Sequence, residues 1–521
     1  MIQNPVLPGF NPDPSFIRVG DDYYLATSTF EWYPGVQIHH SRDLVNWTLV
    51  SRPLRRKAQL DMRGNPDSCG IWAPCLSHAD GKFWLVYTDV KRLEGSFKDA
   101  YNYIVTCDTI DGEWSDPIYV NASGFDPSLF HDDDGRKYFI NMRWNHRGSG
   151  TGGNPKNDSF DGIILQEWDP VKGLMGPVVD LWQGTDLGLG EAPHLFKRNG
   201  YYYLTIAEGG TGYDHAVSLA RSRSITGPYE THPDKHVLTA RFNPESPLQR
   251  VGHGQYVEAA DGSHWHSFLC GRPLPEGRYC PMGRETGLAR VEWRDDWLYL
   301  EGGGFVPPMT IPMPAEKKPD LPVVHDFTMA DLPMDYQWLR TPEPERLFKL
   351  TGQALRLTGR ESMGSWFEQA LVARRQEHHH YRAKCVVEAD PQTWQQAAGL
   401  ATYYNRHKFH MALVSHEEGR KMLVVCSCLG DWQTTKLTYH GRYEMPQSGP
   451  VTIGVEVRGA SQQFTLNGAA VGPELDAKII TDEGGKGEHA SFTGAFVGMF
   501  AHDVTGQGWT ADFSRFGYWP G

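Results

Sequence analysis

The stretch APHLFKRNGYYYLTI (residues 192–206) is one of five similar copies of a single pattern along the chain. The other copies are DPSFIRVGDDYYLA (13–26), APCLSHADGKFWLVY (73–87), DPSLFHDDDGRKYFIN (126–141) and QYVEAADGSHWHSFL (255–269). Each copy is typical of a short strand, a polar turn and a second, aromatic strand, which together make a β-hairpin. The turns are marked, at intervals of 59, 54, 65 and 62 residues, by Asp22, Gly81, Gly135, Gly200 and Gly262. Five such units predict a five-bladed β-propeller. The alternative is a β-sandwich whose strands are similar by coincidence.

The second half of the chain has a different composition. Six prolines crowd into residues 307–322, so we expect residues 307–324 to be a semi-rigid extended linker between two domains. The propeller then occupies residues 1–306, and residues 325–521 form a second domain. That domain contains alternating apolar segments separated by Gly, Asn and Asp turns, notably Val451, Ile453, Val455 and Val457. This alternation predicts an antiparallel β-sandwich and an all-β protein, because no segment has a convincing helical period.

Charge and hydropathy exclude several classes of protein. The chain has 521 residues, with 50 Lys and Arg against 63 Asp and Glu, which gives a net charge of −13. Nucleic acids and anionic membranes attract basic surfaces, so we expect neither as a partner. There is no signal-peptide pattern and no apolar run of about 18 residues, so we expect a cytoplasmic protein. The eight cysteines are too few for a disulfide scaffold in so long a chain, and we expect free thiols.

Three acidic residues occupy related positions in the repeat. Asp13 and Asp126 each stand directly before the proline of their copy, and Glu191 stands one residue earlier in its copy. Equivalent positions of a propeller converge on its central channel, so these side chains are expected to lie close together. Each could instead cap a turn of its own blade. Carboxyl groups facing one another across an aromatic-lined pocket are what glycoside hydrolysis requires, one protonated and one ionised, with a third to tune the acid.

Several longer motifs resemble glycoside hydrolase family 43, and in particular its two-domain β-xylosidases. The motifs are NPVLPGFNPDPSFIRVGDDYYLATSTFEWYPGVQIHHSRDLVNW, GIWAP, GFDPSLF, EAPHLF, CGRPLPEGRYCPMGRETGL and FTGAFVGMFAHDVTG, and they span nearly the whole chain. The resemblance implies a five-bladed propeller followed by a jelly-roll sandwich of the concanavalin type. It also implies an exo-acting enzyme that releases xylose, with inversion, from the non-reducing ends of xylo-oligosaccharides such as xylobiose.

The resemblance implies a role for each carboxylate. Asp13 resembles the general base that activates water, Glu191 resembles the general acid, and Asp126 resembles the carboxylate that tunes and orients that acid. Arg284, in the motif GRET, resembles the arginine that contacts the substrate. Its fixed positive charge can bind sugar hydroxyls and lower the pKa of a carboxylate.

The resemblance also implies the remaining parts of the pocket. Three aromatic residues resemble those that form the walls of the family's single-xylose pocket: Phe30, Trp72 and Trp144. The alternative is that they are core aromatics. Phe492 resembles a residue that the sandwich inserts to close the pocket, and Phe496 competes for that role. His253 falls where the family has a channel histidine, which in some members holds a divalent cation, commonly calcium, through water. One imidazole is a poor calcium site by itself, so a hydrogen bond that orients the pocket is the alternative, and no cofactor is required.

Three functions remain open at this point. The first is a β-xylosidase, and the second is an α-L-arabinofuranosidase or an enzyme with both activities, because the two sugars present similar hydroxyl patterns. The third is a non-catalytic carbohydrate-binding protein, in which one of the three carboxylates would be expected to be missing. The resemblance further implies a homo-oligomer, either a dimer or a tetramer.

Overall fold

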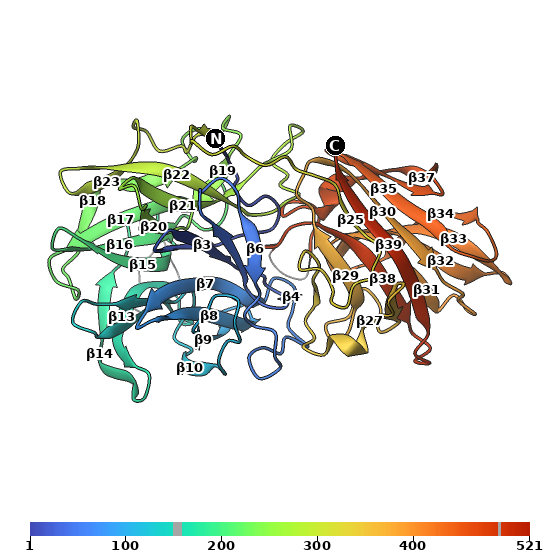
Figure 1. The fold of residues 1–521 in the computed structure, drawn as a ribbon, viewed down its shortest axis with the longest axis horizontal. Helices are drawn as coiled ribbons and strands as arrows, with labels where there is room; N and C mark the ends of the chain where they lie inside the picture. Colours follow the sequence, from blue (N-terminus) through green and yellow to red (C-terminus); the bar gives the residue numbers. More distant parts are fainter. Residues whose placement is uncertain (149–158, 488–490) are drawn as a thin grey trace.

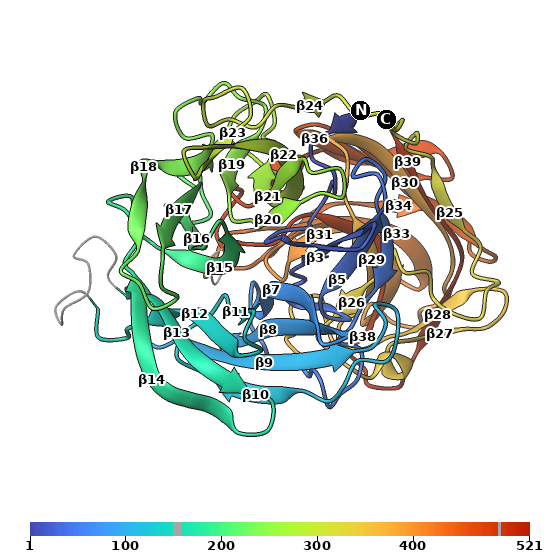
Figure 2. The ribbon, with the colours of Figure 1, turned by 60° about the vertical axis from the view of Figure 1, so that its left-hand side comes forward.

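The computed structural model describes residues 1–148, 159–487 and 491–521, and it contains two all-β domains side by side (Figure 1). The N-terminal domain consists of five small sheets arranged around a common centre (Figure 2). The C-terminal domain consists of two larger sheets. The predicted fold class, a five-bladed propeller followed by a sandwich, is therefore confirmed.

Blades 1 to 4 are antiparallel sheets whose strands are paired in chain order, and the fifth blade is also antiparallel but its first two strands both pair with the third. Blade 1 contains β2 (Ser15–Val19), β3 (Asp22–Thr27), β5 (Gln37–Ser41) and β6 (Thr48–Ser51). Blade 2 contains β7 (Gly70–Ala79), β8 (Lys82–Arg92), β9 (Asp99–Cys107) and β10 (Ile118–Asn121). Blade 3 contains β11 (Ser128–His131), β12 (Lys137–Trp144), β13 (Phe160–Asp169) and β14 (Gly173–Trp182). Blade 4 contains β15 (Glu191–Arg198), β16 (Tyr201–Glu208), β17 (Ala216–Ser222) and β18 (Glu230–Thr239). Blade 5 contains β19 (Gln249–Gly252), β20 (Tyr256–Glu258), β21 (His264–Gly271), β22 (Glu285–Arg294) and β23 (Trp297–Leu300).

The predicted hairpin turns join the first two strands of blades 1 to 4. Asn199 and Gly200, between β15 and β16, have φ angles of 49° and 74°. A two-residue type I′ turn requires this left-handed backbone at both positions, and Asn-Gly adopts it at little cost. Blade 1 differs from the prediction, because Asp22 is already the first residue of β3 and the turn lies at Gly20, whose φ is 62°.

The ring is closed by the N-terminal segment. Strand β1 (Ile2–Gln3) pairs with β24 (Thr310–Ile311), and the Asn4 side chain hydrogen-bonds to both backbone groups of Leu288 in blade 5. Strand β24 lies inside the proline-rich stretch 307–324. That stretch therefore contributes a strand to the closure of the propeller as well as leading to the second domain.

The second domain is a sandwich of two antiparallel sheets. One sheet has the order β27 (Phe348–Leu350), β28 (Leu355–Thr358), β39 (Thr510–Pro520), β30 (His380–Glu388), β35 (Val451–Arg458), β36 (Ser461–Leu466) and β37 (Ala469–Asp476), with β25 (Val323–His325) paired to β39. The other has the order β29 (Ala370–Arg375), β38 (Phe496–Asp503), β31 (Gln396–Asn405), β32 (Lys408–Glu417), β33 (Arg420–Leu429) and β34 (Leu437–Glu444). Two short 3₁₀ helices are η2 (Pro344–Arg346) and η3 (Ala477–Ile480). The alternating residues predicted between 451 and 457 lie on β35 with their apolar side chains buried in the core between the sheets.

The two domains are joined by strand pairing, ring stacking and buried charge. Strand β26 (Trp338–Leu339) pairs with β4 (Trp32–Tyr33) of the propeller. The rings of Trp32 and Phe496 stack with their centroids 3.7 Å apart. The Asp67 carboxylate of the propeller accepts hydrogen bonds from Arg340 at 2.7 Å and Arg406 at 3.1 Å, both from the sandwich. Removing one partner of such a buried pair is costly, so the sandwich is held firmly against the propeller.

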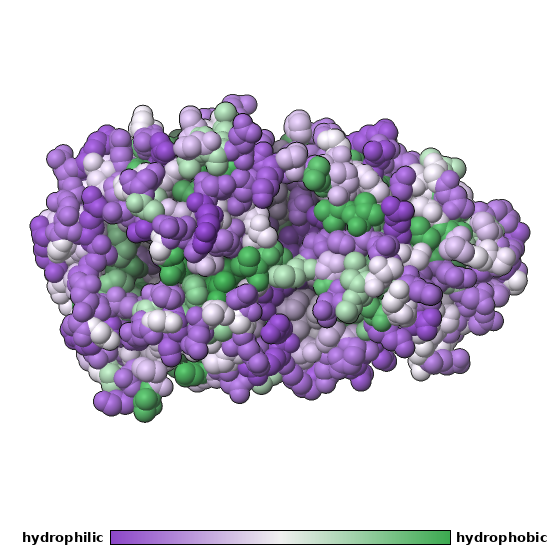
Figure 3. All heavy atoms as spheres, in the orientation of Figure 1, coloured by the Kyte–Doolittle hydropathy of each residue, from purple (hydrophilic) through white to green (hydrophobic). Residues whose placement is uncertain are grey.

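The face shown in Figure 3 is mostly hydrophilic, and several separate groups of apolar side chains lie on it, one of them near its middle. All eight cysteines are buried and free, as predicted. Among the described residues, no helix has the length and apolar character needed to cross a membrane.

Candidate active site

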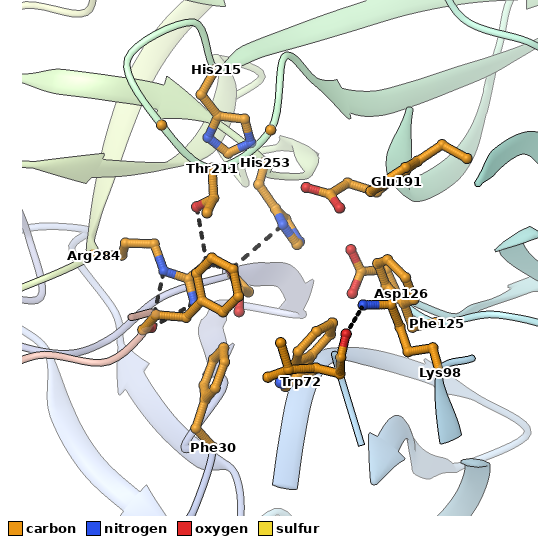
Figure 4. Close-up of a pocket in the computed structure, with 16 residues that line it drawn as sticks. Phe30, Trp72, Lys98, Phe125, Asp126, Glu191, Thr211, His215, His253 and Arg284 are labelled. Carbon is orange, nitrogen blue, oxygen red and sulfur yellow. Dashed lines mark hydrogen bonds and ion pairs between the residues drawn. The ribbon is translucent and has the colours of Figure 1, made fainter. Parts of the chain in front are cut away.

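A pocket of about 380 Å³ lies among residues in or next to the innermost strands of the five blades, including Asp13, Trp72, Asp126, Glu191 and His253. Its volume is in the range of small-molecule sites. Five further polar or charged side chains lie here beside the predicted carboxylates (Figure 4). Two of them, His253 and Arg284, were predicted from their motifs, and the other three are Lys98, Thr211 and His215. The full lining is Asp13, Phe30, Trp72, Leu93, Lys98, Phe125, Asp126, Phe160, Glu191, Gly210, Thr211, Gly212, His215, His253, Arg284 and Phe492.

The three predicted carboxylates converge on this pocket because the same backbone bend precedes the inner strand of three blades. Asp13 before β2, Asp126 before β11 and Ala192 in β15 have φ angles of 57°, 52° and 51°. These left-handed angles are uncommon for residues with a side chain, and their repetition marks a shared bend. Glu191 precedes Ala192, and its side chain also lines the pocket. The prediction that these carboxylates are spatial neighbours is confirmed.

Asp13 is buried and fixed at both carboxylate oxygens. Ser28 Oγ donates to Oδ2 at 2.6 Å, and Arg284 Nη1 donates to Oδ1 at 2.8 Å. The Arg284 guanidinium lies 5.1 Å from the ring centroid of Phe30 and 5.8 Å from that of Phe492. A charge-assisted hydrogen bond beside two apolar rings gives the carboxylate one well-defined orientation.

Glu191 and Asp126 lie in a different electrostatic environment. Burial and, to a smaller extent, the negative charge of Asp13 raise the pKa of Glu191 to about 7, against the opposing positive charges of Arg284 and Lys98. Burial also raises the pKa of Asp126 well above its usual range, with Glu191 and Asp13 adding to the effect, although the Ala192 backbone N–H opposes it. Carboxyl groups on this side of the pocket therefore hold a proton near neutral pH, whereas Asp13 is ion-paired.

Aromatic rings form the walls, and two of the three predicted wall residues contribute. Phe30 and Trp72 line the pocket with their ring centroids 5.9 Å apart. Trp144 does not line it: its ring lies behind Lys98, 4.4 Å from the ammonium nitrogen, and its indole N–H donates to Ser96 O at 2.9 Å. Phe125, which the sequence analysis missed, stands in the wall instead, 5.2 Å from Trp72.

The sandwich domain completes the pocket through Phe492. The Phe492 side chain lines the cavity, its backbone N–H donates to Ser68 Oγ at 3.1 Å, and its carbonyl accepts from Arg284 Nη2 at 2.9 Å. Phe496 is the first residue of β38 and is fully buried against Trp32. Of the two candidates, Phe492 therefore enters the pocket and Phe496 belongs to the domain interface.

Comparison with known proteins agrees with this geometry. The family model described as glycosyl hydrolases family 43 matches residues 2–298, and the model described as a beta xylosidase C-terminal concanavalin A-like domain matches residues 324–519. The chain belongs to glycosyl hydrolase family 43. Xylosidase/arabinosidase 43B of Humicola insolens is 53% identical over 100% of this chain and 98% of that protein. The beta-xylosidase of Bacillus subtilis is 43% identical over 99% of both chains. The crystal structure of xylan beta-1,4-xylosidase from Bacillus halodurans C-125 has a TM-score of 0.93 and 45% identity, with 100% of both chains covered.

His253 lies beside the family 43 carboxylates, and its surroundings do not fit a calcium site built from protein ligands. Its Nδ1 is 3.7 Å from Asp13 Oδ1, and burial, with the charge of Arg284, lowers its pKa to about 3. A neutral imidazole next to a guanidinium lacks the several oxygen ligands that calcium prefers. Within the described part of the chain, no group of three His, Cys, Asp or Glu residues is arranged to hold a metal ion. The imidazole instead packs against Asp13 and helps to confine it.

Three polar pocket residues were missed because they lie on loops outside the repeat. Lys98 lies between β8 and β9, and Thr211 and His215 lie at or near the start of β17. Thr211 Oγ1 accepts a hydrogen bond from Arg284 at 3.2 Å. Phe125 had a usable signal, since it directly precedes Asp126 in a motif that the sequence analysis quoted.

Proposed function

We propose that this family 43 protein is an exo-acting, inverting β-xylosidase that releases xylose from the non-reducing end of xylo-oligosaccharides. The observation that carries the proposal is the convergence of three carboxylates from three blades on one aromatic pocket, with one ion-paired and two that favour the protonated form. The names of the relatives at 43% and 53% identity support xylose as the sugar.

The proposed reaction divides the work between the two sides of the pocket. Asp13 accepts a proton from a water molecule, whose oxygen attacks the anomeric carbon. The bond from this carbon to the leaving oxygen breaks, and Glu191 gives its proton to that oxygen. Because water attacks from the side opposite the leaving group, the product has the inverted configuration. Both carboxyl groups return to their starting forms by exchange with solvent.

The other residues act by binding and electrostatics. Asp126 and Glu191 are buried beside each other, and the negative charge of Glu191 makes Asp126 harder to ionise, so this side of the pocket holds a proton until the leaving oxygen takes it from Glu191. Arg284 has one guanidinium nitrogen on Asp13 and can donate to sugar hydroxyls. Phe30, Trp72 and Phe492 present flat apolar faces to a sugar ring. Phe492 supports the exo-acting mode, because the sandwich closes one side of the pocket and leaves room for a chain end.

One alternative keeps specific support. An α-L-arabinofuranosidase, or an enzyme with both activities, is favoured by the name xylosidase/arabinosidase of the relative at 53% identity. A non-catalytic binding protein has no such support, because all three carboxylates are present and line the pocket.

The choice between the two sugars is tested with matched aryl glycosides. We expect kcat/KM on 4-nitrophenyl β-D-xylopyranoside to exceed that on 4-nitrophenyl α-L-arabinofuranoside. Because the leaving group is the same, the ratio measures recognition of the sugar alone. A higher kcat/KM on the arabinoside would reverse the assignment, and no hydrolysis of either would remove the glycosidase proposal.

A further inference from the structure

Lys98 brings a second positive charge into the pocket. It lies on the loop between β8 and β9, and its ammonium is on the side of Asp126 and Glu191, whereas Arg284 lies on the opposite side (Figure 4). The Lys98 nitrogen is 5.3 Å from the Trp72 ring centroid, 5.5 Å from Phe125 and 4.4 Å from Trp144. It donates one hydrogen bond, to Leu93 O at 3.2 Å. Three ring faces and a carbonyl therefore hold this ammonium.

The cage keeps the ammonium near the carboxylates without letting it touch them. Within residues 1–148, 159–487 and 491–521, Lys98 forms no ion pair with a carboxylate. Cation–π contacts in a desolvated site replace part of the lost hydration of the ammonium. A direct ion pair with Glu191 would stabilise its ionised form, and an ionised carboxylate has no proton to give to a leaving oxygen.

The charges in the pocket can be counted. Asp13, Asp126 and Glu191 are three potential negative charges, and Arg284 and Lys98 are two positive ones. Arg284 is already paired with Asp13. One positive charge then remains for Asp126 and Glu191 together, so the pair is balanced when it carries one negative charge and one proton.

Three other titratable groups near this pair are neutral and do not change the count. Burial lowers the pKa of His253 and of His215 to about 3, so both rings are neutral in the range of interest. Burial raises the pKa of the Cys69 thiol far above neutrality, and the thiol is uncharged. Burial lowers the pKa of Lys98, while the carboxylates of Glu191, Glu94 and Asp126 oppose that shift and favour the charged ammonium.

We infer that Lys98 is a positioning residue of the reaction: its caged ammonium balances the charge of Asp126 and Glu191 from a distance, so that this pair carries one negative charge and one proton rather than two protons. The inference rests on the proposed function and adds a residue to it. It also explains why Trp144, which does not line the pocket, stacks against Lys98 as the back of the cage.

The test compares Lys98→Met and Lys98→Arg with Lys82→Met. Lys82 is a matched control because it lies in the same blade with its nitrogen over the Trp84 ring, at 5.7 Å, but outside the pocket. The readout is kcat/KM on xylobiose from pH 5 to pH 9. Without the ammonium, the carboxyl pair holds its proton more tightly, so Lys98→Met is expected to move the basic limb upward by about 1 pH unit. Lys98→Arg and Lys82→Met are expected to leave the limb within about 0.3 unit of the wild type.

A second readout needs no substrate. The second readout is the melting temperature as a function of pH. In the wild type, the melting temperature should fall as pH rises toward the pKa of the carboxyl pair, because the folded protein keeps a proton that the unfolded chain loses. In Lys98→Met, this fall should extend to higher pH. If Lys98→Met does not fold, Lys98→Gln replaces it. An unmoved limb and an unmoved stability profile in the folded variant would overturn the inference, as would an equal shift in Lys82→Met. A wild type that does not cleave xylobiose would instead contradict the proposed function, and the stability profile would still decide the role of Lys98.

Discussion

The pKa of Glu191 makes a quantitative prediction about the pH dependence of the reaction. A general acid works only in its protonated form, and burial raises the pKa of this carboxyl to about 7. The protonated fraction is then about 90% at pH 6, about 10% at pH 8 and about 1% at pH 9. We therefore expect kcat/KM on xylobiose to be nearly constant below pH 6, to fall about fivefold between pH 7 and pH 8, and to fall about tenfold for each unit above pH 8.

The variant Glu191→Gln identifies the group responsible for that limb. Gln keeps the size of the side chain but cannot donate this proton, so we expect a loss of about 10²- to 10⁴-fold on xylobiose. The loss should be smaller on 4-nitrophenyl β-xyloside, whose leaving group needs little protonation, and the basic limb should disappear. The control is Glu230→Gln, which changes an exposed glutamate of the same blade. A Glu191→Gln enzyme with wild-type rates on xylobiose, or with an unchanged limb at pH 7, would refute the assignment of Glu191 as the acid.

Three further predictions concern stability and the domain interface. Between pH 4.5, the usual pKa of a glutamate, and about pH 7, the folded protein keeps the Glu191 proton that the unfolded chain loses, so the free energy of unfolding of the wild type should fall by at most about 3 kcal/mol over that range. Glu191→Gln should therefore unfold at a higher temperature than the wild type at pH 8 but not at pH 4.5. Phe492→Ala removes one wall of the pocket and should raise KM for xylobiose and the inhibition constant of xylose together, by about tenfold, with the melting temperature changed by less than about 3 °C; unchanged constants would contradict the closing role of this ring. Asp67→Asn removes the counter-charge of two buried arginines and should cost about 3 to 5 kcal/mol in urea unfolding, and a loss below about 1 kcal/mol would contradict the importance assigned to this cluster.

The repeat made the carboxylates predictable from the sequence. Because equivalent positions of a propeller face one centre, aligning Asp13 with Asp126 was enough to bring them together, and the one-residue offset of Glu191 still left its side chain in the pocket. The left-handed backbone at Asp13, Asp126 and Ala192 shows why: the three inner strands begin with the same bend.

Residues outside the repeat could not be placed in this way. Trp144 and Lys98 belong to the end of β12 and to a loop of blade 2, and only the three-dimensional structure shows that the lysine stands between the tryptophan and the cavity. Phe492 and Phe496 lie four residues apart in one motif, and the choice between them depends on where β38 begins and on Trp32 across the domain interface. Local sequence patterns do not encode contacts between domains.

The measurement that tests the central claim most directly is a proton NMR time course of xylobiose hydrolysis, recorded before the released sugar mutarotates. If Asp13 activates water and Glu191 protonates the leaving oxygen, α-xylose should appear first. β-Xylose appearing first would mean retention through a covalent intermediate, and it would contradict the role proposed for Asp13.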